Sequence, residues 1–127
     1  MIDALFSQPA YLAAKKSLDA VALRQEAIAS NIANLETPGY KRVDLSPGFE
    51  SELQRAVASG DSSQIAGLQP SIAVDSNAVP DSRDGNTVNL ESELSEMNQN
   101  SVLNSLETQL VSWNLARMRM VITGKPA

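Results

Sequence analysis

A seven-residue apolar repeat in the first third of the chain, followed at once by a proline–glycine pair, constrains the fold more than any other feature. Between residues 11 and 35 the repeat alternates steps of three and four, which is typical of a helix that packs along one stripe against other helices. At about 1.5 Å per residue, this helix would be roughly 36 Å long. A solitary helix of this kind is marginal in water, so the repeat predicts helical partners. The stripe contains Tyr11, Ala14, Leu18, Val21, Gln25, Ile28, Ile32 and Leu35.

The helix is predicted to stop at a turn in residues 37–40. Proline fixes φ near the value needed at the second position of a β-turn, and glycine readily takes the positive φ of the third position. The residue before proline is also excluded from the helical region. We therefore expect a type II turn. Two asparagines precede it on one helix face, where they could cap exposed carbonyl groups or contact another subunit. The motif consists of Asn31, Asn34, Thr37, Pro38, Gly39 and Tyr40.

Gln25 is the polar position within the apolar stripe. It can be interpreted as a tolerated, partly solvated side chain. Alternatively, it sets the register between helices, as a buried amide can in coiled coils. The sequence leaves both interpretations open.

Residues 43–87 differ from both ends of the chain. Prolines and glycines recur among serine, asparagine and aspartate, which favours a loop-rich insert. Within it, apolar residues at positions 49, 53 and 57 predict a short helix over residues 49–59, and residues 71–74 fit one short strand.

A second long helix is predicted from near Asn89 to about Thr123, because Asn89 can cap its start and Gly124 its end. Glu91 and Glu93 place negative charge in its first turn. Two adjacent apolar faces over its last turns exceed what one antiparallel helix can cover, so further partners are implied.

Together these patterns predict a mainly α fold. Two long N- and C-terminal helices pack as a coiled-coil-like pair, joined by a loop-rich middle with a short helix and one short strand. The expected divisions are 1–42 (N-terminal helix and motif turn), 43–87 (irregular insert) and 88–127 (C-terminal helix). Aromatic residues are only 4% of the chain against 43% apolar overall, which favours helix contacts over a large core.

Several function classes are disfavoured by composition. The chain has no cysteine and no histidine, which removes thiol nucleophiles, imidazole bases and the commonest zinc ligands. The net charge is −5, without a basic stripe, so we expect no nucleic-acid binding. No apolar run is long enough to span a membrane. The first residues lack a basic leader and a cleavage site, so we expect any export to proceed without a cleaved signal peptide.

Acidic residues are the candidates for chemistry. Asp75, Asp81, Asp84, Glu91, Glu93 and Glu96 could supply paired carboxylates for glycan cleavage or metal binding. The aspartates lack an EF-hand's spacing, and the glutamates look like a solvated helix face. We therefore expect no catalysis, no metal and no cofactor. The basic pair Lys41 and Arg42 is expected to form salt bridges with acidic neighbours.

Two segments resemble the flagellar rod and hook family. The asparagine-containing segment that ends in Thr-Pro-Gly-Tyr resembles the N-terminal motif of bacterial flagellar axial proteins. Residues 84–91 (Asp-Gly-Asn-Thr-Val-Asn-Leu-Glu), followed by Glu93, Met97 and Asn100, are similar to the start of the C-terminal helix in the proximal rod members. Many relatives have an Arg-Tyr pair about where this chain has Leu103 and Asn104, so no contact is assigned there.

The resemblance implies a structural, non-enzymatic subunit of the proximal rod, located in the periplasm and exported by the flagellar type III apparatus. Such a subunit assembles through its terminal helices, connects the membrane (MS) ring and the export-gate or adaptor proteins to the other rod subunits, and transmits torque. The interface would include Leu18, Val21, Ile28, Ile32, Leu35, Leu90, Leu94, Met97, Leu106, Leu110, Trp113, Leu115, Met118 and Ile122.

Three alternatives remain at this point. The chain could be the neighbouring proximal rod protein of the same family. It could be a stand-alone coiled-coil adaptor, which should form a small closed oligomer instead of contacts that continue along a helix. A glycan-cleaving enzyme would need a carboxylate pair, and the sequence favours no particular pair.

Overall fold

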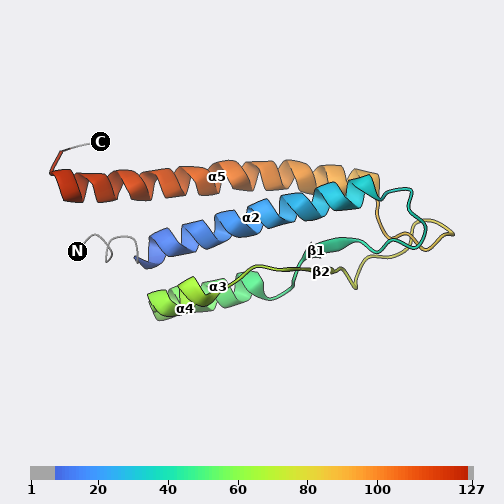
Figure 1. Ribbon diagram of the computed structural model, residues 1–127, viewed down its shortest axis with the longest axis horizontal. Helices are drawn as coiled ribbons and strands as arrows, with labels where there is room; N and C mark the ends of the chain where they lie inside the picture. The colour runs from blue at the N-terminus through green and yellow to red at the C-terminus, as the bar shows by residue number, and fades with distance from the viewer. Residues whose placement is uncertain (1–7, 126–127) are drawn as a thin grey trace.

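Two long antiparallel helices form the main body of the protein. The computed structural model describes residues 8–125 and places helix α2 (Pro9–Ala33) alongside helix α5 (Leu90–Thr123) over most of the length of α2 (Figure 1). Helix α5 continues beyond the start of α2. The predicted mainly helical fold with two long terminal helices is therefore confirmed.

The ends of these helices follow from their capping residues. Pro9 occupies the first turn of α2, where its missing N–H costs no hydrogen bond. Ser7, whose residue type favours an N-cap position, lies outside the described residues. At the start of α5 the Asn89 side chain accepts a hydrogen bond from Ser92 N–H at 3.0 Å. Gly124 ends α5 with a φ of +66°, as predicted.

The middle of the chain contains more regular structure than the sequence indicated. It forms strand β1 (Val43–Leu45), helix α3 (Phe49–Ser59), helix α4 (Ser62–Gly67) and strand β2 (Ile72–Val74). The two strands pair in antiparallel register, with Val43 opposite Val74 and Leu45 opposite Ile72. The predicted short helix and short strand are present, whereas β1 and α4 were missed.

Helix α2 lies between two layers. One side packs on α5, and the other packs on α3, α4 and the small sheet (Figure 1). The compact apolar core lies on the second side and joins α2 to the middle of the chain. Its buried members are Ala20, Phe49, Leu53, Ala56 and Ile65.

Much of α5 lies outside this core. Its second half exposes large apolar side chains, including Leu106, Leu110 and Trp113. Within residues 8–125, no helix is both long and apolar enough to span a membrane.

The motif corner as the candidate functional site

The two segments that carry the resemblance lie against each other at one end of the molecule (Figure 1). Residues 31–42 contain the end of α2 and the motif turn. Residues 84–93 lead into α5 and form its first turn. We refer to these two segments together as the corner. The fold thus brings two sequence motifs into one structural unit.

The turn predicted at residues 37–40 is present. Tyr40 N–H donates to the carbonyl of Thr37 at 3.2 Å, and Gly39 has a φ of +71°. Just before the turn, Asn34 Nδ2 donates to the carbonyl of Ser30 at 2.8 Å, and Asn34 Oδ1 accepts from the Thr37 hydroxyl at 3.1 Å. Asn34 therefore caps the end of α2, which is one of the roles that the sequence left open.

Asn86 holds the turn from the second segment. Its side-chain Nδ2 lies 2.9 Å from the carbonyl oxygen of Asn34, 3.0 Å from that of Leu35 and 2.8 Å from that of Thr37. Its Oδ1 accepts from Val88 N–H at 2.8 Å. Asn86 is only 2% exposed. A buried amide with these contacts supplies donors to carbonyl groups that the end of α2 leaves free.

Backbone hydrogen bonds join the same two segments. Gly39 N–H donates to the carbonyl of Asp84 at 3.0 Å, and Thr87 N–H donates to the carbonyl of Tyr40 at 3.1 Å. Arg42 N–H donates to the Thr87 hydroxyl at 2.8 Å. The motif turn is therefore fixed against the start of α5 by main-chain contacts as well as by side chains.

Asn31 connects α2 to both β1 and α5. Its Nδ2 donates to the carbonyl of Val43 at 2.8 Å, and its Oδ1 accepts from Val43 N–H at 2.9 Å. The same Nδ2 lies 3.1 Å from Glu93 Oε2. Asn31 and Glu93 are both 0% exposed. Replacing either side chain would leave buried polar groups without partners.

Glu93 corrects the expectation of a solvated glutamate face. It points into the protein instead of into solvent, because Arg42 and Asn31 provide polar partners there. Arg42 Nε donates to Glu93 Oε1 at 2.5 Å. Nothing in the residue pattern distinguishes this glutamate, which is fully enclosed, from its neighbours Glu91 and Glu96, which are not.

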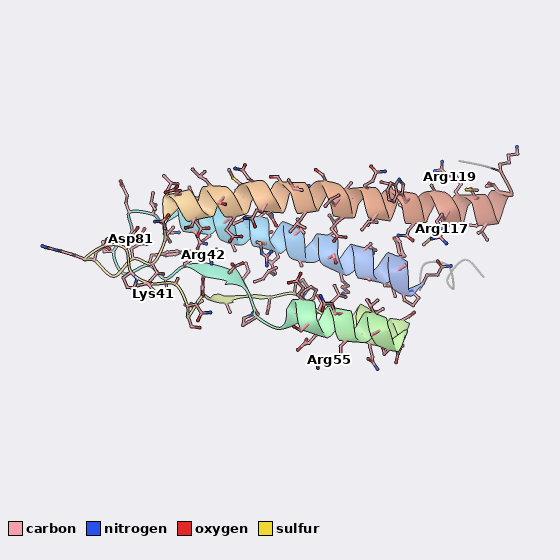
Figure 2. The ribbon with its side chains drawn as sticks, turned by 180° about the vertical axis from the view of Figure 1, so that it is seen from behind. Lys41, Arg42, Arg55, Asp81, Arg117 and Arg119 are labelled. Atoms are coloured by element: carbon pink, nitrogen blue, oxygen red, sulfur yellow. The ribbon has the colours of Figure 1, made fainter. Side chains whose placement is uncertain are left out.

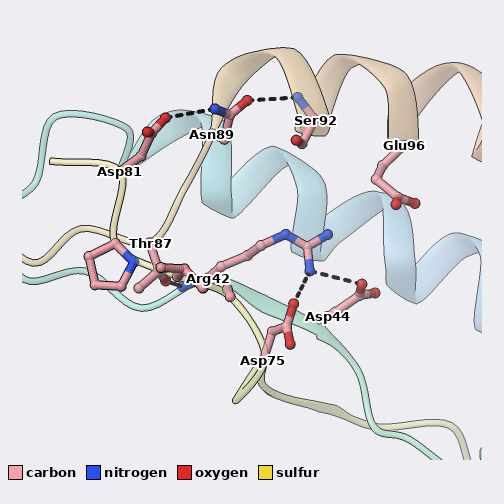
Figure 3. Close-up of a pocket in the computed structure, with 11 residues that line it drawn as sticks. Arg42, Asp44, Asp75, Asp81, Thr87, Asn89, Ser92 and Glu96 are labelled. Carbon is pink, nitrogen blue, oxygen red and sulfur yellow. Dashed lines mark hydrogen bonds and ion pairs between the residues drawn. The ribbon is translucent and has the colours of Figure 1, made fainter.

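Arg42 is the centre of the charged part of the corner. Besides Glu93, its Nη1 donates to Asp44 Oδ2 at 3.0 Å and to Asp75 Oδ2 at 2.9 Å (Figure 3). Burial alone would lower the pKa of Arg42, but the hydrogen bonds and charges of Glu93 and Asp44 raise that pKa above its ordinary value. The guanidinium therefore stays charged and joins β1, the residue that follows β2, and α5.

Of the basic pair, Arg42 forms the predicted salt bridges, whereas Lys41 binds a backbone carbonyl instead of an acid. Lys41 Nζ donates to the carbonyl of Gly85 at 2.9 Å. Arg24 on α2 lies 3.3 Å from Asp44 and adds a second cation to the same group of acids.

A shallow cleft of about 490 Å³ lies beside Arg42 (Figure 3). Of the candidate carboxylates, Asp75 is held by Arg42, and Asp81 accepts a hydrogen bond from Asn89 Nδ2 at 2.7 Å. Glu96 also lines the cleft. Within residues 8–125, no group of three or more acids is placed to hold a metal ion. The arrangement supports a structural junction of ion pairs.

Gln25 has a polar partner on α5. Asn100 Nδ2 donates to Gln25 Oε1 at 3.0 Å and to the carbonyl of Val21 at 3.0 Å. Asn100 is buried, whereas Gln25 itself is exposed, as expected for a tolerated, partly solvated side chain. Its hydrogen bond to Asn100 nevertheless joins the two long helices, and a role in setting their register stays a prediction.

The predicted interface residues fall into two groups in the single chain. On α2, Val21 and Ile28 are buried, and Leu18 and Ile32 are half-buried, as is Leu35 just after the helix. On α5, Met118 is buried and Met97 is half-buried, while the others remain exposed: Leu90, Leu94, Leu106, Leu110, Trp113, Leu115 and Ile122.

Comparison with known proteins gives a consistent picture. A family model described as "Flagella basal body rod protein" matches residues 13–41 of this chain. That match covers the second and later turns of α2 together with the motif turn.

Similar proteins match most of the chain. The flagellar basal body rod protein FlgB of Borrelia hermsii is 31% identical and aligns with 86% of this chain and 92% of its own length. FlgB of Salmonella typhimurium is 33% identical over 87% of this chain and 90% of its own length. FlgB of Escherichia coli is 31% identical over 85% and 88%.

Proposed function

Since this chain belongs to the FlgB-type family of flagellar basal body rod proteins, we propose that it assembles through its terminal helices into the proximal rod of the flagellum. In this role the subunit is structural and has no catalytic activity. It connects the membrane ring and the export apparatus to the rest of the rod.

The exposed apolar surface of α5 is the observation that carries this proposal. Trp113 is 59% exposed and Leu106 56% exposed in the single chain. Water contact with such residues is unfavourable by about 25 cal/mol per Å² of apolar surface. Packing against other subunits removes that surface from water, so assembly completes the burial that the chain alone leaves unfinished.

The corner suits a subunit that must transmit torque. Rotation of a rod places mechanical stress on the joint between its inner helices and the middle segments of the chain that lie outside them. Buried hydrogen bonds hold this joint. Asn86 bonds to the motif turn and Asn31 bonds to Glu93 of α5, and in each case the partner is distant in the sequence. We propose that the corner fixes the angle at which the chain leaves α2, so that the long helices keep their alignment under load.

Localisation follows from the same role. The subunit lies in the periplasmic part of the basal body and reaches it through the flagellar export apparatus. Its partners are other rod subunits, the membrane ring and the export-gate or adaptor proteins.

Deletion of the gene tests the proposal. We expect loss of motility and of filaments, restored by a plasmid copy. The tagged chain should copurify with detergent-extracted basal bodies. Motile deletion cells, or a chain that is absent from basal bodies and elutes as a small closed oligomer, would instead identify a stand-alone adaptor.

A further inference from the structure

Helix α5 carries a second heptad stripe, which lies beside the side chains that pack on α2; its first member, Leu103, also borders a cleft that α2 and α3 line. Positions 103, 106, 110, 113, 117 and 120 alternate steps of three and four, the spacing of a helix–helix contact. All six side chains are exposed, and five of them are large and apolar. We call this set the outer stripe of α5; it contains Leu103, Leu106, Leu110, Trp113, Arg117 and Met120.

Helix α2 has an exposed face of small and charged residues. Its other two faces are occupied by α5 and by the core with α3 and α4. Positions 15, 19, 22, 26, 29 and 33 have heptad spacing and are all exposed. Half of them are alanines, which let another helix approach closely. We call this set the open face of α2; it contains Lys15, Asp19, Ala22, Glu26, Ala29 and Ala33.

Charge also matches between the two surfaces. Arg117 is the cation of the outer stripe, and it makes no ion pair in the part of the chain that the structure describes. Asp19 and Glu26 lie seven residues apart on the open face of α2 and likewise have no ion pair among residues 8–125. Figure 2 shows Arg117 near the C-terminal end of α5.

We propose that the outer stripe of α5 packs on the open face of α2 in a second copy of this chain, with Arg117 beside the acids Asp19 and Glu26. Large side chains then fill the space left by the alanines, and the arginine gains a partner. The inference rests on the proposed function and specifies which surfaces of the subunit meet.

The contact is heterologous, because it joins two different surfaces. Each copy offers its α5 stripe to one neighbour and its α2 face to another. Such contacts close into a ring or continue along a helix, as a rod requires, and they do not stop at a dimer.

Photo-crosslinking in intact basal bodies tests the contact. The full chain carries Trp113→p-benzoylphenylalanine and replaces the normal copy in cells; the control places the same residue at Ser112, which points to another face of α5. We expect the residue at 113 to give a dimer of the chain, with the crosslinked peptide inside residues 15–33. The control should give no such product.

Charge exchange gives a second readout. Arg117→Glu should reduce the crosslinked dimer about tenfold, because like charges then face each other. The pair Asp19→Lys and Glu26→Lys should do the same, and combining all three changes should restore the dimer. Arg119→Glu, off the stripe, serves as the matched control, and circular dichroism confirms that each variant folds.

The outcomes separate the two proposals. If the chain is present in basal bodies but position 113 crosslinks to another protein, to a different region, or to nothing, this inference is wrong and the proposed function stands. If the combined charge exchange fails to restore the dimer, the pairing is wrong. If the chain is absent from basal bodies, the proposed function falls, and this inference with it.

Discussion

Replacing Arg42 by methionine should destabilise the protein more than any other change of a single charged residue in the corner. The carboxylate of Glu93 is fully buried and would keep only the amide of Asn31 as a partner. Removing one partner of a buried ion pair costs about 3–5 kcal/mol, because the remaining charge is left uncompensated. A domain of this size has a total stability of about 5–15 kcal/mol.

The reverse change should cost less. In a Glu93→Met variant, Arg42 keeps Asp44 and Asp75, whose side chains are 28% and 25% exposed and therefore partly solvated. We expect a loss of about 1.5–3 kcal/mol, the range for a hydrogen bond to a charged group. The double variant Arg42→Met/Glu93→Met should be more stable than Arg42→Met alone, since no buried charge remains without a partner.

Urea unfolding followed by circular dichroism at 222 nm measures these differences. Arg55→Met is the matched control, because Arg55 is exposed and makes no ion pair among residues 8–125; it should change stability by less than about 0.5 kcal/mol. Figure 2 shows Arg42 and Arg55 on different parts of the molecule. A loss below about 1 kcal/mol for Arg42→Met, or equal losses for the two single variants, would refute the account of the buried pair.

Three further predictions concern the turn, its partner segment and pH. Gly39→Ala should cost about 1–2 kcal/mol in urea unfolding, because the φ of +71° strains any residue with a Cβ, whereas Gly67→Ala, without positive φ, should cost less than half as much. Asn86→Leu should cost at least about 2 kcal/mol, since buried carbonyls lose their donor, and should speed hydrogen exchange at the backbone amides of Thr37, Gly39 and Tyr40. Unchanged exchange would contradict this. Burial raises the pKa of Glu107, so its carboxyl group holds a proton more tightly in the folded protein than in the unfolded chain. This protonation stabilises the folded state below the ordinary pKa of glutamate, and the stabilisation is lost as pH rises. The stability of Glu107→Gln should therefore increase relative to that of the wild type as pH rises from acidic to neutral. A pH-independent difference would refute that assignment.

The long helices could be predicted from the sequence because their signals are local. The heptad stripe, the Pro–Gly turn and the capping residues Asn89 and Gly124 each act within a few residues of their own position. The short helix α3 was also predicted, because its apolar residues recur at one helix face and Gly60 ends it.

The two elements that were not predicted, β1 and α4, depend on contacts between segments that are distant in the sequence. Strand β1 is three residues long and exists because Asn31 and β2 satisfy its backbone groups. Helix α4 has only six residues; Asp61 caps its start, and the burial of Ile65 in the core stabilises it. No local periodicity could identify either element.

The roles of Asn86, Glu93 and Asn100 were missed for the same reason. Each is a polar residue in a segment that looks solvent-facing, and each is buried by a partner more than 45 residues away. The segment from residue 84 to residue 100, which resembles flagellar rod proteins, contains all three residues and was the one sign in the sequence that they matter. Without the fold, nothing indicated that the segments meet.

A cryo-electron microscopy map of the isolated basal body tests the central claim most directly. The account predicts that this chain lies in the proximal rod, with α2 and α5 in the inner helical layer and the exposed apolar side chains of α5 buried against neighbouring subunits. The corner should lie at the outer end of the helices, with the contacts of Asn86 and Arg42 intact. A map in which the chain is absent from the rod, or in which Leu106 and Trp113 remain in contact with solvent, would contradict the account.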